Sequence, residues 1–183
     1  RWRSGRQRRA TTTLTQGAII DVLRRAGVEV IVAGRKAGPV RGAHSVVVTA
    51  DAALGAIDVE ELGMVVLPGG MPGAAHLAED PVVQRIVRAL DARQGYVAAI
   101  CAAPMALAAA GVLRGKRVTC YPGFESHLGA AEVVEDRVVV DGRLITSRGP
   151  GTALEFALVL VGLLRGEPAA AKLAKGMIAS HSG

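Results

Sequence analysis

The residue whose type and position best suit chemistry is Cys101, which ends the apolar run 96–100 and is followed by two alanines and Pro104. A strand that turns abruptly into a helix lifts the residue at the turn out of the sheet, and the small Ala102 permits the crowding of such a turn. The helix N-terminus that follows favours a thiolate and predicts a lowered thiol pKa. The local pattern leaves two interpretations open: a nucleophilic, oxidisable thiol, or a cysteine buried in the core.

A pair of glycines, Gly69 and Gly70, closes a second apolar run, 63–70. Glycines at the carboxyl end of a strand let backbone N–H groups approach a ligand oxygen. Together with the N–H of Ala102, they would form a pair of donors that stabilises an oxyanion. The alternative interpretation is a plain tight turn, which is common in the loops of α/β proteins.

These candidates need a scaffold, and the chain predicts one in which strands alternate with helices. Asp80 as N-cap and Pro81 at the first helical position indicate a helix start, and Asp141-Gly142 indicates a hairpin turn. Such an alternation predicts a mostly parallel sheet covered on both faces, with sites at the carboxyl ends of its strands. The predicted strands are 28–34, 45–51, 63–70, 96–100 and 116–122, with a hairpin in 131–151, and the predicted helices are 17–27, 80–95, 103–113, 152–166 and about 168–179.

The length and composition of the chain limit the class of protein to which it can belong. The 183 residues suit one domain, and with only 3% aromatic residues the core must consist mostly of Val, Leu, Ile and Ala. Two cysteines, Cys101 and Cys120, do not make a disulfide scaffold in a chain this long, so they are expected as free thiols in a reducing compartment. No apolar run reaches about 18 residues, so neither a transmembrane helix nor a membrane partner is expected.

The net charge of +6 comes from the start of the chain. Five of the 22 basic residues lie within residues 1–9, which leaves 17 basic against 16 acidic residues in the remainder. The remainder of the chain is nearly neutral and lacks aromatic residues interleaved with Lys and Arg. It is therefore not expected to bind nucleic acid.

Residues 1–16 are expected to form a basic tail, and residues 17–183 a single domain. The tail is rich in Arg and Thr, has no acidic residue and shows no apolar period. Three interpretations of it stay open: a transit peptide, a disordered tail, and a misread start of the gene. The protein is expected in the cytoplasm, or in a plastid or mitochondrion if the tail is a transit peptide. A doubly wound domain normally begins with a central strand, so the first strand is doubtful, although residues 11–14 could form a short one.

The segments VVLPGGMPGAAHL, AAICAAPMALAAAGVLRGKRVT and LITSRGPGTALEFAL resemble the DJ-1 branch of the DJ-1/PfpI superfamily. DVLRRAGVEVIVAG resembles the first helix and second strand of the same branch, and the four motifs occur in the right order. The resemblance covers residues from about 17 to 179. It implies a flavodoxin-like three-layer α/β sandwich that is usually a homodimer.

The resemblance also implies a function. It gives Cys101 as the reactive cysteine, with oxyanion contacts from the backbone of Gly70 and Ala102. The family is associated with conversion of methylglyoxal and glyoxal to hydroxy acids without a cofactor or metal, and with deglycation of proteins and nucleotides. The alternative that the family offers is a non-catalytic protein that senses redox state or protects other proteins as a chaperone during oxidative stress.

The chain departs from the family at residues that bear on catalysis. The family carries a glutamate that hydrogen-bonds the cysteine and moves protons, and its position here falls on Thr15. A threonine hydroxyl can donate a hydrogen bond but cannot act as a carboxylate base at neutral pH. The histidine that follows the cysteine in the protease-like branch is Ala102 here, so a Cys-His protease is not expected. The histidine of the DJ-1 branch is replaced by Tyr121, which can hydrogen-bond a substrate but is a poor base.

Two further residues, Cys120 and Arg148, have two interpretations each. Cys120 would lie near the site, either as a resolving thiol for oxidised Cys101 or as a buried spectator. Arg148 would either hold an anion or a dimer contact, or belong to a hydrogen-bonded loop before the helix that Thr152 caps. His127 and His44 are expected at the surface.

Overall fold

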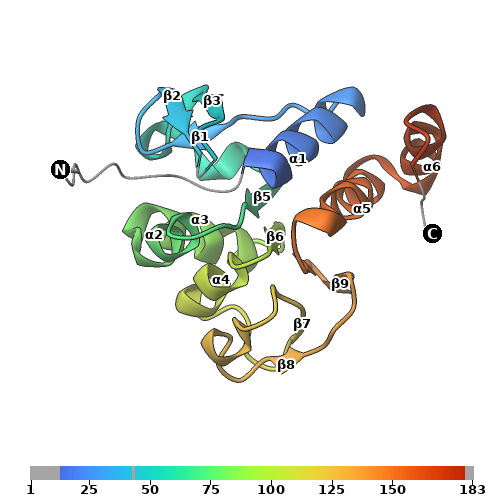
Figure 1. The fold of residues 1–183 in the computed structure, drawn as a ribbon. Coiled ribbons are helices and arrows are strands. Elements are labelled where there is room, and N and C mark those ends of the chain that lie inside the picture. Colours follow the sequence, from blue (N-terminus) through green and yellow to red (C-terminus); the bar gives the residue numbers. More distant parts are fainter. Residues whose placement is uncertain (1–12, 43, 180–183) are drawn as a thin grey trace, which may run out of the picture.

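The computed structural model describes residues 13–42 and 44–179 and has a mixed α/β fold, with a central sheet between two groups of helices (Figure 1). The sheet has the strand order β5-β6-β10-β9. Strands β5, β6 and β10 run parallel, and β9 pairs with β10 antiparallel. The fold class and the mostly parallel sheet are therefore confirmed. The bounds are β5 (Met64–Leu67), β6 (Tyr96–Ile100), β9 (Val138–Asp141) and β10 (Leu144–Ser147).

Strand β6 is buried on both faces because side chains alternate along a strand. Ala98 and Ile100 belong to one hydrophobic cluster of the core, and Val97 and Ala99 belong to the other. Both neighbours of β6 are parallel strands, so its backbone is paired along both edges. This explains the unbroken apolar run before Cys101 and places that residue at the carboxyl end of a central strand.

Helices cover both faces of the sheet (Figure 1). Phe156 and Ile19 pack in the first cluster from two helices, and Val83 and Leu107 pack in the second from two others. Asp80 is the N-cap of the helix that begins at Pro81, as predicted, since its carboxylate accepts hydrogen bonds from the backbone N–H groups of Val82 and Val83. The helices are α1 (Thr13–Arg25), α5 (Ala153–Arg165) and α6 (Glu167–Gly176) in one group, and α2 (Gly73–Glu79), α3 (Pro81–Ala92) and α4 (Pro104–Ala110) in the other.

Two of the predicted strands are shorter than expected and lie outside the central sheet. Of residues 28–34 only β1 (Ala33–Gly34) is a strand, and it pairs with β4 (Ala52–Ala53). Of residues 45–51, β3 (Val47–Ala50) forms a separate hairpin with β2 (Gly38–Arg41). Within the described ranges, residues 28–32 are assigned to no strand and have no ladder partner.

The doubtful first strand falls mostly on residues 1–12, which lie outside the described residues. The part of 11–14 that is described belongs to α1, so a strand over those positions is wrong there. Helix α1 also includes residues 13–16, which were expected in the basic tail. Among the described residues, no helix is long and apolar enough to cross a membrane.

The segment after α4 is less regular than predicted. Only β7 (Arg117–Val118) of the expected strand 116–122 forms, and it pairs with β8 (Glu132–Val133) in a separate two-stranded sheet beside β9. Residues 119–122 follow it as an irregular segment. Short 3₁₀ helices occupy several connections: η1 (Leu54–Ala56), η2 (Val59–Glu61), η3 (Glu125–His127) and η4 (Pro150–Thr152).

Candidate functional site

Cys101 lies on a sharp turn between β6 and α4. Its φ is +66°, in the left-handed region that residues with a Cβ rarely adopt. The backbone N–H of Cys101 donates to the carbonyl of Ser147, 2.9 Å away, which ties the turn to the end of β10. The side chain is 7% exposed. The backbone is thus held in a strained conformation at the point where a nucleophile would be presented.

The backbone of Gly69 lies directly against this turn. A Cβ on Gly69 would come within 2.4 Å of the Cys101 Cβ and 2.5 Å of the Ile100 carbonyl oxygen, so only glycine fits. Gly70 has a φ of +97°. The backbone N–H groups of Gly70 and Ala102 both hydrogen-bond the Cys101 thiol. The structure therefore brings together the thiol and the two amides that the sequence offered as oxyanion donors.

The fit of Gly69 gives a first prediction. Gly69→Ala is expected to lower the free energy of unfolding by about 1–3 kcal/mol, the usual cost of overpacking, and to displace the thiol from its amides. Urea denaturation and the rate of Cys101 alkylation measure the two effects. Gly63→Ala is a matched control, because a Cβ there meets nothing within 4 Å. Equal effects of both substitutions would contradict the close approach.

The Cys101 thiol does not have the lowered pKa that the sequence predicted. Burial raises its pKa above the usual value of 9.0, and the hydrogen bonds from Ala102 and Gly70 only partly offset this. The groups that favour the thiolate are neutral amides, and α4 begins three residues further on, at Pro104. Desolvation by the core around β6 therefore outweighs the local dipoles.

The raised pKa predicts how the thiol reacts with pH. Because burial raises the pKa of Cys101, the protonated thiol predominates at neutral pH, and Cys101 is expected to alkylate more slowly than a free cysteine. The rate should rise about tenfold per pH unit and continue to rise beyond pH 9. Iodoacetamide labelling of a Cys120→Ser variant, followed by mass spectrometry, measures the profile. A plateau that begins near neutral pH would contradict it.

Cys120 and Tyr121 lie beside the Cys101 turn. The Tyr121 N–H donates to the carbonyl of Cys101, 2.9 Å away. The Tyr121 ring is 45% exposed and packs against Gly149. Cys120 is buried, and its pKa is raised to about 11 by burial and by the Glu125 carboxylate.

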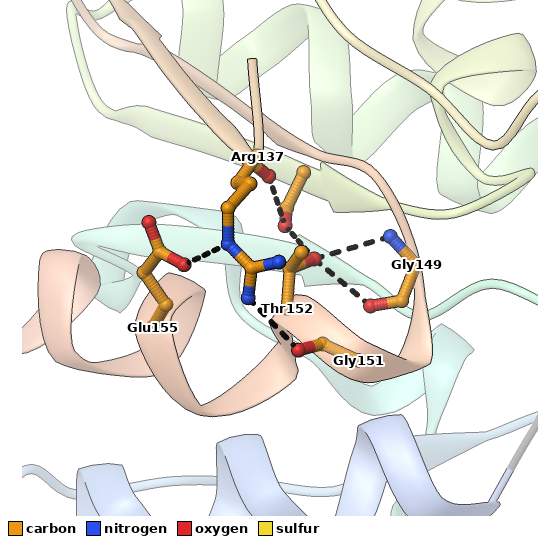
Figure 2. Close-up of polar contacts among 6 residues, drawn as sticks. Arg137, Gly149, Gly151, Thr152 and Glu155 are labelled. Atoms are coloured by element: carbon orange, nitrogen blue, oxygen red, sulfur yellow. Dashed lines mark hydrogen bonds and ion pairs between the residues drawn. The ribbon is translucent and has the colours of Figure 1, made fainter. Parts of the chain in front are cut away.

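The loop after β10 is held by a network of polar contacts (Figure 2). Thr152 stands at the N-cap position of α5, as predicted, but its hydroxyl makes no hydrogen bond to the helix backbone. The hydroxyl instead donates to the Gly149 carbonyl and accepts from the Gly149 N–H. The Ser147 hydroxyl lies 2.6 Å from that of Thr152 and donates to the carbonyl of Arg137. This network favours the structural interpretation of the loop.

Arg137, directly before β9, holds this loop from outside and was not predicted from the sequence. Its guanidinium pairs with Glu155 at 2.7 Å and donates to the Gly151 carbonyl at 3.1 Å (Figure 2). Arg148 is half-buried, and its charge acts on Cys120 to favour the thiolate. No local motif marked Arg137, because it is 14 and 18 residues from its two partners.

Thr15 is fully buried in α1, and its hydroxyl has no hydrogen-bond partner. Ile19 lies one turn further along the same helix face and packs in the hydrophobic cluster that contains Cys101. The first acidic residue of the chain, Asp21, is exposed and pairs with Arg25. Within the described part of α1, the buried face therefore presents a hydroxyl where a carboxylate was expected.

His44 and His127 are both exposed, as expected, and the His127 ring packs near Phe124. In residues 13–42 and 44–179, no group of three His, Cys, Asp or Glu side chains is arranged to hold a metal ion.

Comparisons with known proteins agree on one family. The model of the DJ-1/PfpI family matches residues 14–163. Protein dj-1beta of Drosophila melanogaster is 42% identical over 165 residues, which are 88% of each chain. The glutathione-independent glyoxalase DJR-1.2 of Caenorhabditis elegans is 38% identical over 80% of this chain and 78% of its own. The crystal structure of Drosophila DJ-1beta superposes with a TM-score of 0.91 at 39% identity, over 94% of this chain and 95% of that one.

Proposed function

The chain belongs to the DJ-1/PfpI family, and from this membership we propose that it is a DJ-1-like glyoxalase or deglycase that acts on methylglyoxal or glyoxal adducts. The observation that carries the proposal is the Cys101 thiol on its strained turn, hydrogen-bonded by the Gly70 and Ala102 amides. A relative at 38% identity is itself a glutathione-independent glyoxalase. The reaction that we propose needs no cofactor, because each step can be assigned to a thiol, an amide or a base.

The steps follow from the geometry. The Cys101 thiolate adds to the aldehyde carbon of methylglyoxal, and a hemithioacetal forms. The amides of Gly70 and Ala102 hold the oxygen that carries the developing negative charge. A base then moves a proton between the two carbons, and water releases the hydroxy acid. We assign the half-exposed Tyr121, whose backbone bonds the Cys101 carbonyl, the role of hydrogen-bonding the substrate.

We propose that turnover is impaired at the proton transfer. The position of the family glutamate is Thr15, whose buried hydroxyl cannot act as a carboxylate base. The Cys101 thiol is mostly protonated at neutral pH, which adds to the impairment. Addition of the thiol to the aldehyde is retained, and isomerisation is slowed.

The proposal is tested by measuring lactate formed from methylglyoxal without glutathione or any added cofactor. Lactate above the buffer rate, removed by prior iodoacetamide treatment, supports a cysteine-dependent glyoxalase. If neither the chain nor a folded Thr15→Glu variant forms lactate or deglycates a methylglyoxal adduct, the enzyme is ruled out.

The second candidate is a redox sensor or chaperone-like protective protein without turnover. It is favoured by the combination of a retained Cys101 turn and a buried Thr15 in place of the base. Such a role needs only an oxidisable thiol. As in the family in general, we propose a homodimer, which sedimentation velocity tests directly.

A further inference from the structure

The two cysteines of the chain lie next to each other in space, although 18 residues separate them in sequence. The hydrogen bond from the Tyr121 N–H to the Cys101 carbonyl is 2.9 Å long. The Tyr121 nitrogen lies about 2.4 Å from the Cys120 Cα, and the Cys101 carbonyl oxygen lies about 2.4 Å from the Cys101 Cα. The Cα atoms of the two cysteines therefore lie within roughly 8 Å of each other. A disulfide spans about 4.4–6.8 Å between Cα atoms. Both thiols are free, and the charge of Cys101 acts electrostatically on Cys120.

The surroundings of both thiols permit a small approach. Cys101 packs in the first hydrophobic cluster and Cys120 in the second, so Cys120 must leave its cluster to reach Cys101, and Phe124 packs against both clusters. Residues 119–122 belong to no strand, so they are not held in a sheet ladder. The Thr119 N–H donates to the Thr146 hydroxyl of β10, 2.9 Å away, so this segment has a tie to the central sheet. Formation of the disulfide requires a rotation of the Cys120 side chain and a shift of this segment.

We propose that Cys120 is the resolving thiol of Cys101, and that a peroxide converts the pair into a reversible intramolecular disulfide that takes Cys101 out of the candidate site. The inference rests on the reactive Cys101 of the proposed function, but not on glyoxalase chemistry. It assigns Cys120 a role that the proposed reaction does not use.

The electrons and atoms balance in two steps. The Cys101 thiolate attacks a peroxide oxygen, the O–O bond breaks, and Cys101 becomes a sulfenic acid while the peroxide is reduced to water or an alcohol. The Cys120 thiolate then attacks the Cys101 sulfur, the S–S bond forms, and the S–O bond breaks with loss of water. A dithiol reductant returns both cysteines to thiols.

Burial and, after it, the charges around Cys120 set the thiolate fraction on which the second step depends. With a pKa of about 11, its thiolate is roughly one part in 10⁴ at neutral pH, and this fraction rises about tenfold per pH unit. Glu125 raises this pKa, and Arg148 lowers it. The disulfide therefore competes better with further oxidation of Cys101 to sulfinic acid as the pH rises.

The test treats the whole chain with dilute hydrogen peroxide at several pH values and measures intact mass, with dimedone present in parallel to trap sulfenic acid. The wild type is expected to lose two hydrogens per chain, reversibly with dithiothreitol. Cys120→Ser should instead give a dimedone adduct at Cys101. Disulfide formation should be severalfold faster in Glu125→Gln and severalfold slower in Arg148→Met, because one pKa unit corresponds to about a factor of ten.

Three results would overturn the inference. Equal dimedone trapping in the wild type and in Cys120→Ser, without a disulfide, rejects the resolving role and leaves the proposed function intact. A disulfide between two chains, seen on a non-reducing gel, rejects the intramolecular pair. If Cys101 gives neither adduct nor disulfide in any variant, the reactive thiol itself is rejected, and the proposed function fails with it.

Discussion

Thr15→Glu is expected to raise the rate of lactate formation from methylglyoxal by about 10²–10⁴-fold, which is the usual contribution of a positioned general base. The expectation rests on the position of Thr15, which is fully buried on the helix face that carries Ile19 into the cluster of Cys101. The hydroxyl that it replaces has no hydrogen-bond partner, so no hydrogen bond is lost with it. The gain should appear mainly in kcat, because the base acts on the bound hemithioacetal.

The matched control is Thr15→Gln, which has the size of glutamate and cannot take up a proton at neutral pH. Both variants place a longer side chain in a packed site, so each is expected to lose about 1–3 kcal/mol of stability. Urea denaturation shows whether both remain folded. An equal gain of activity in the glutamine variant, or no gain in a folded glutamate variant, would contradict the role given to this position.

The parts of the site that the sequence could predict depend on local geometry. A buried strand that ends at Cys101 and is followed by small residues predicts the turn, and the φ of +66° bears this out. The glycine pair predicts a close approach, and the 2.4 Å separation between a Gly69 Cβ and the Cys101 Cβ shows why no larger residue fits. These features follow from residues within a few positions of each other.

The thiol pKa could not be predicted, because its direction depends on tertiary burial. A helix start after Cys101 is visible in the sequence, but the core around it also contains Phe156 and Ile19 from α5 and α1. Their removal of water raises the pKa more than the two amides lower it. The same limit applies to Arg137, whose partners lie far away in sequence.

The strand at 28–34 was overpredicted for a related reason. Its apolar alternation is real, but a strand is defined by its pairing, and within the described residues only Ala33–Gly34 finds a partner. The Val32 N–H instead donates to the carboxylate of Asp51 at 2.9 Å. Pattern alone cannot show which neighbour supplies the hydrogen bonds.

Cys101→Ala is expected to lower lactate formation by about 10³-fold or more, both in the chain as it is and in the Thr15→Glu background. In the proposed mechanism the thiol forms the bond to substrate, so no other group can replace it. The Thr15→Glu background is needed because its higher starting rate allows the assay to measure the full loss of activity caused by Cys101→Ala. Cys120→Ser serves as the matched control and should keep the activity, since Cys120 takes no part in the proposed reaction.

The combination of Cys101→Ala with Thr15→Glu also separates two explanations of any rescue. If the glutamate acts as base on a Cys101 adduct, the double variant should be as inactive as Cys101→Ala alone, and the two effects should be strongly non-additive. If the glutamate promotes the isomerisation of free methylglyoxal, the double variant keeps the added rate. Substantial lactate from that variant would remove Cys101 from the mechanism, and would leave its strained turn and two amides to be explained by the chemistry of oxidation alone.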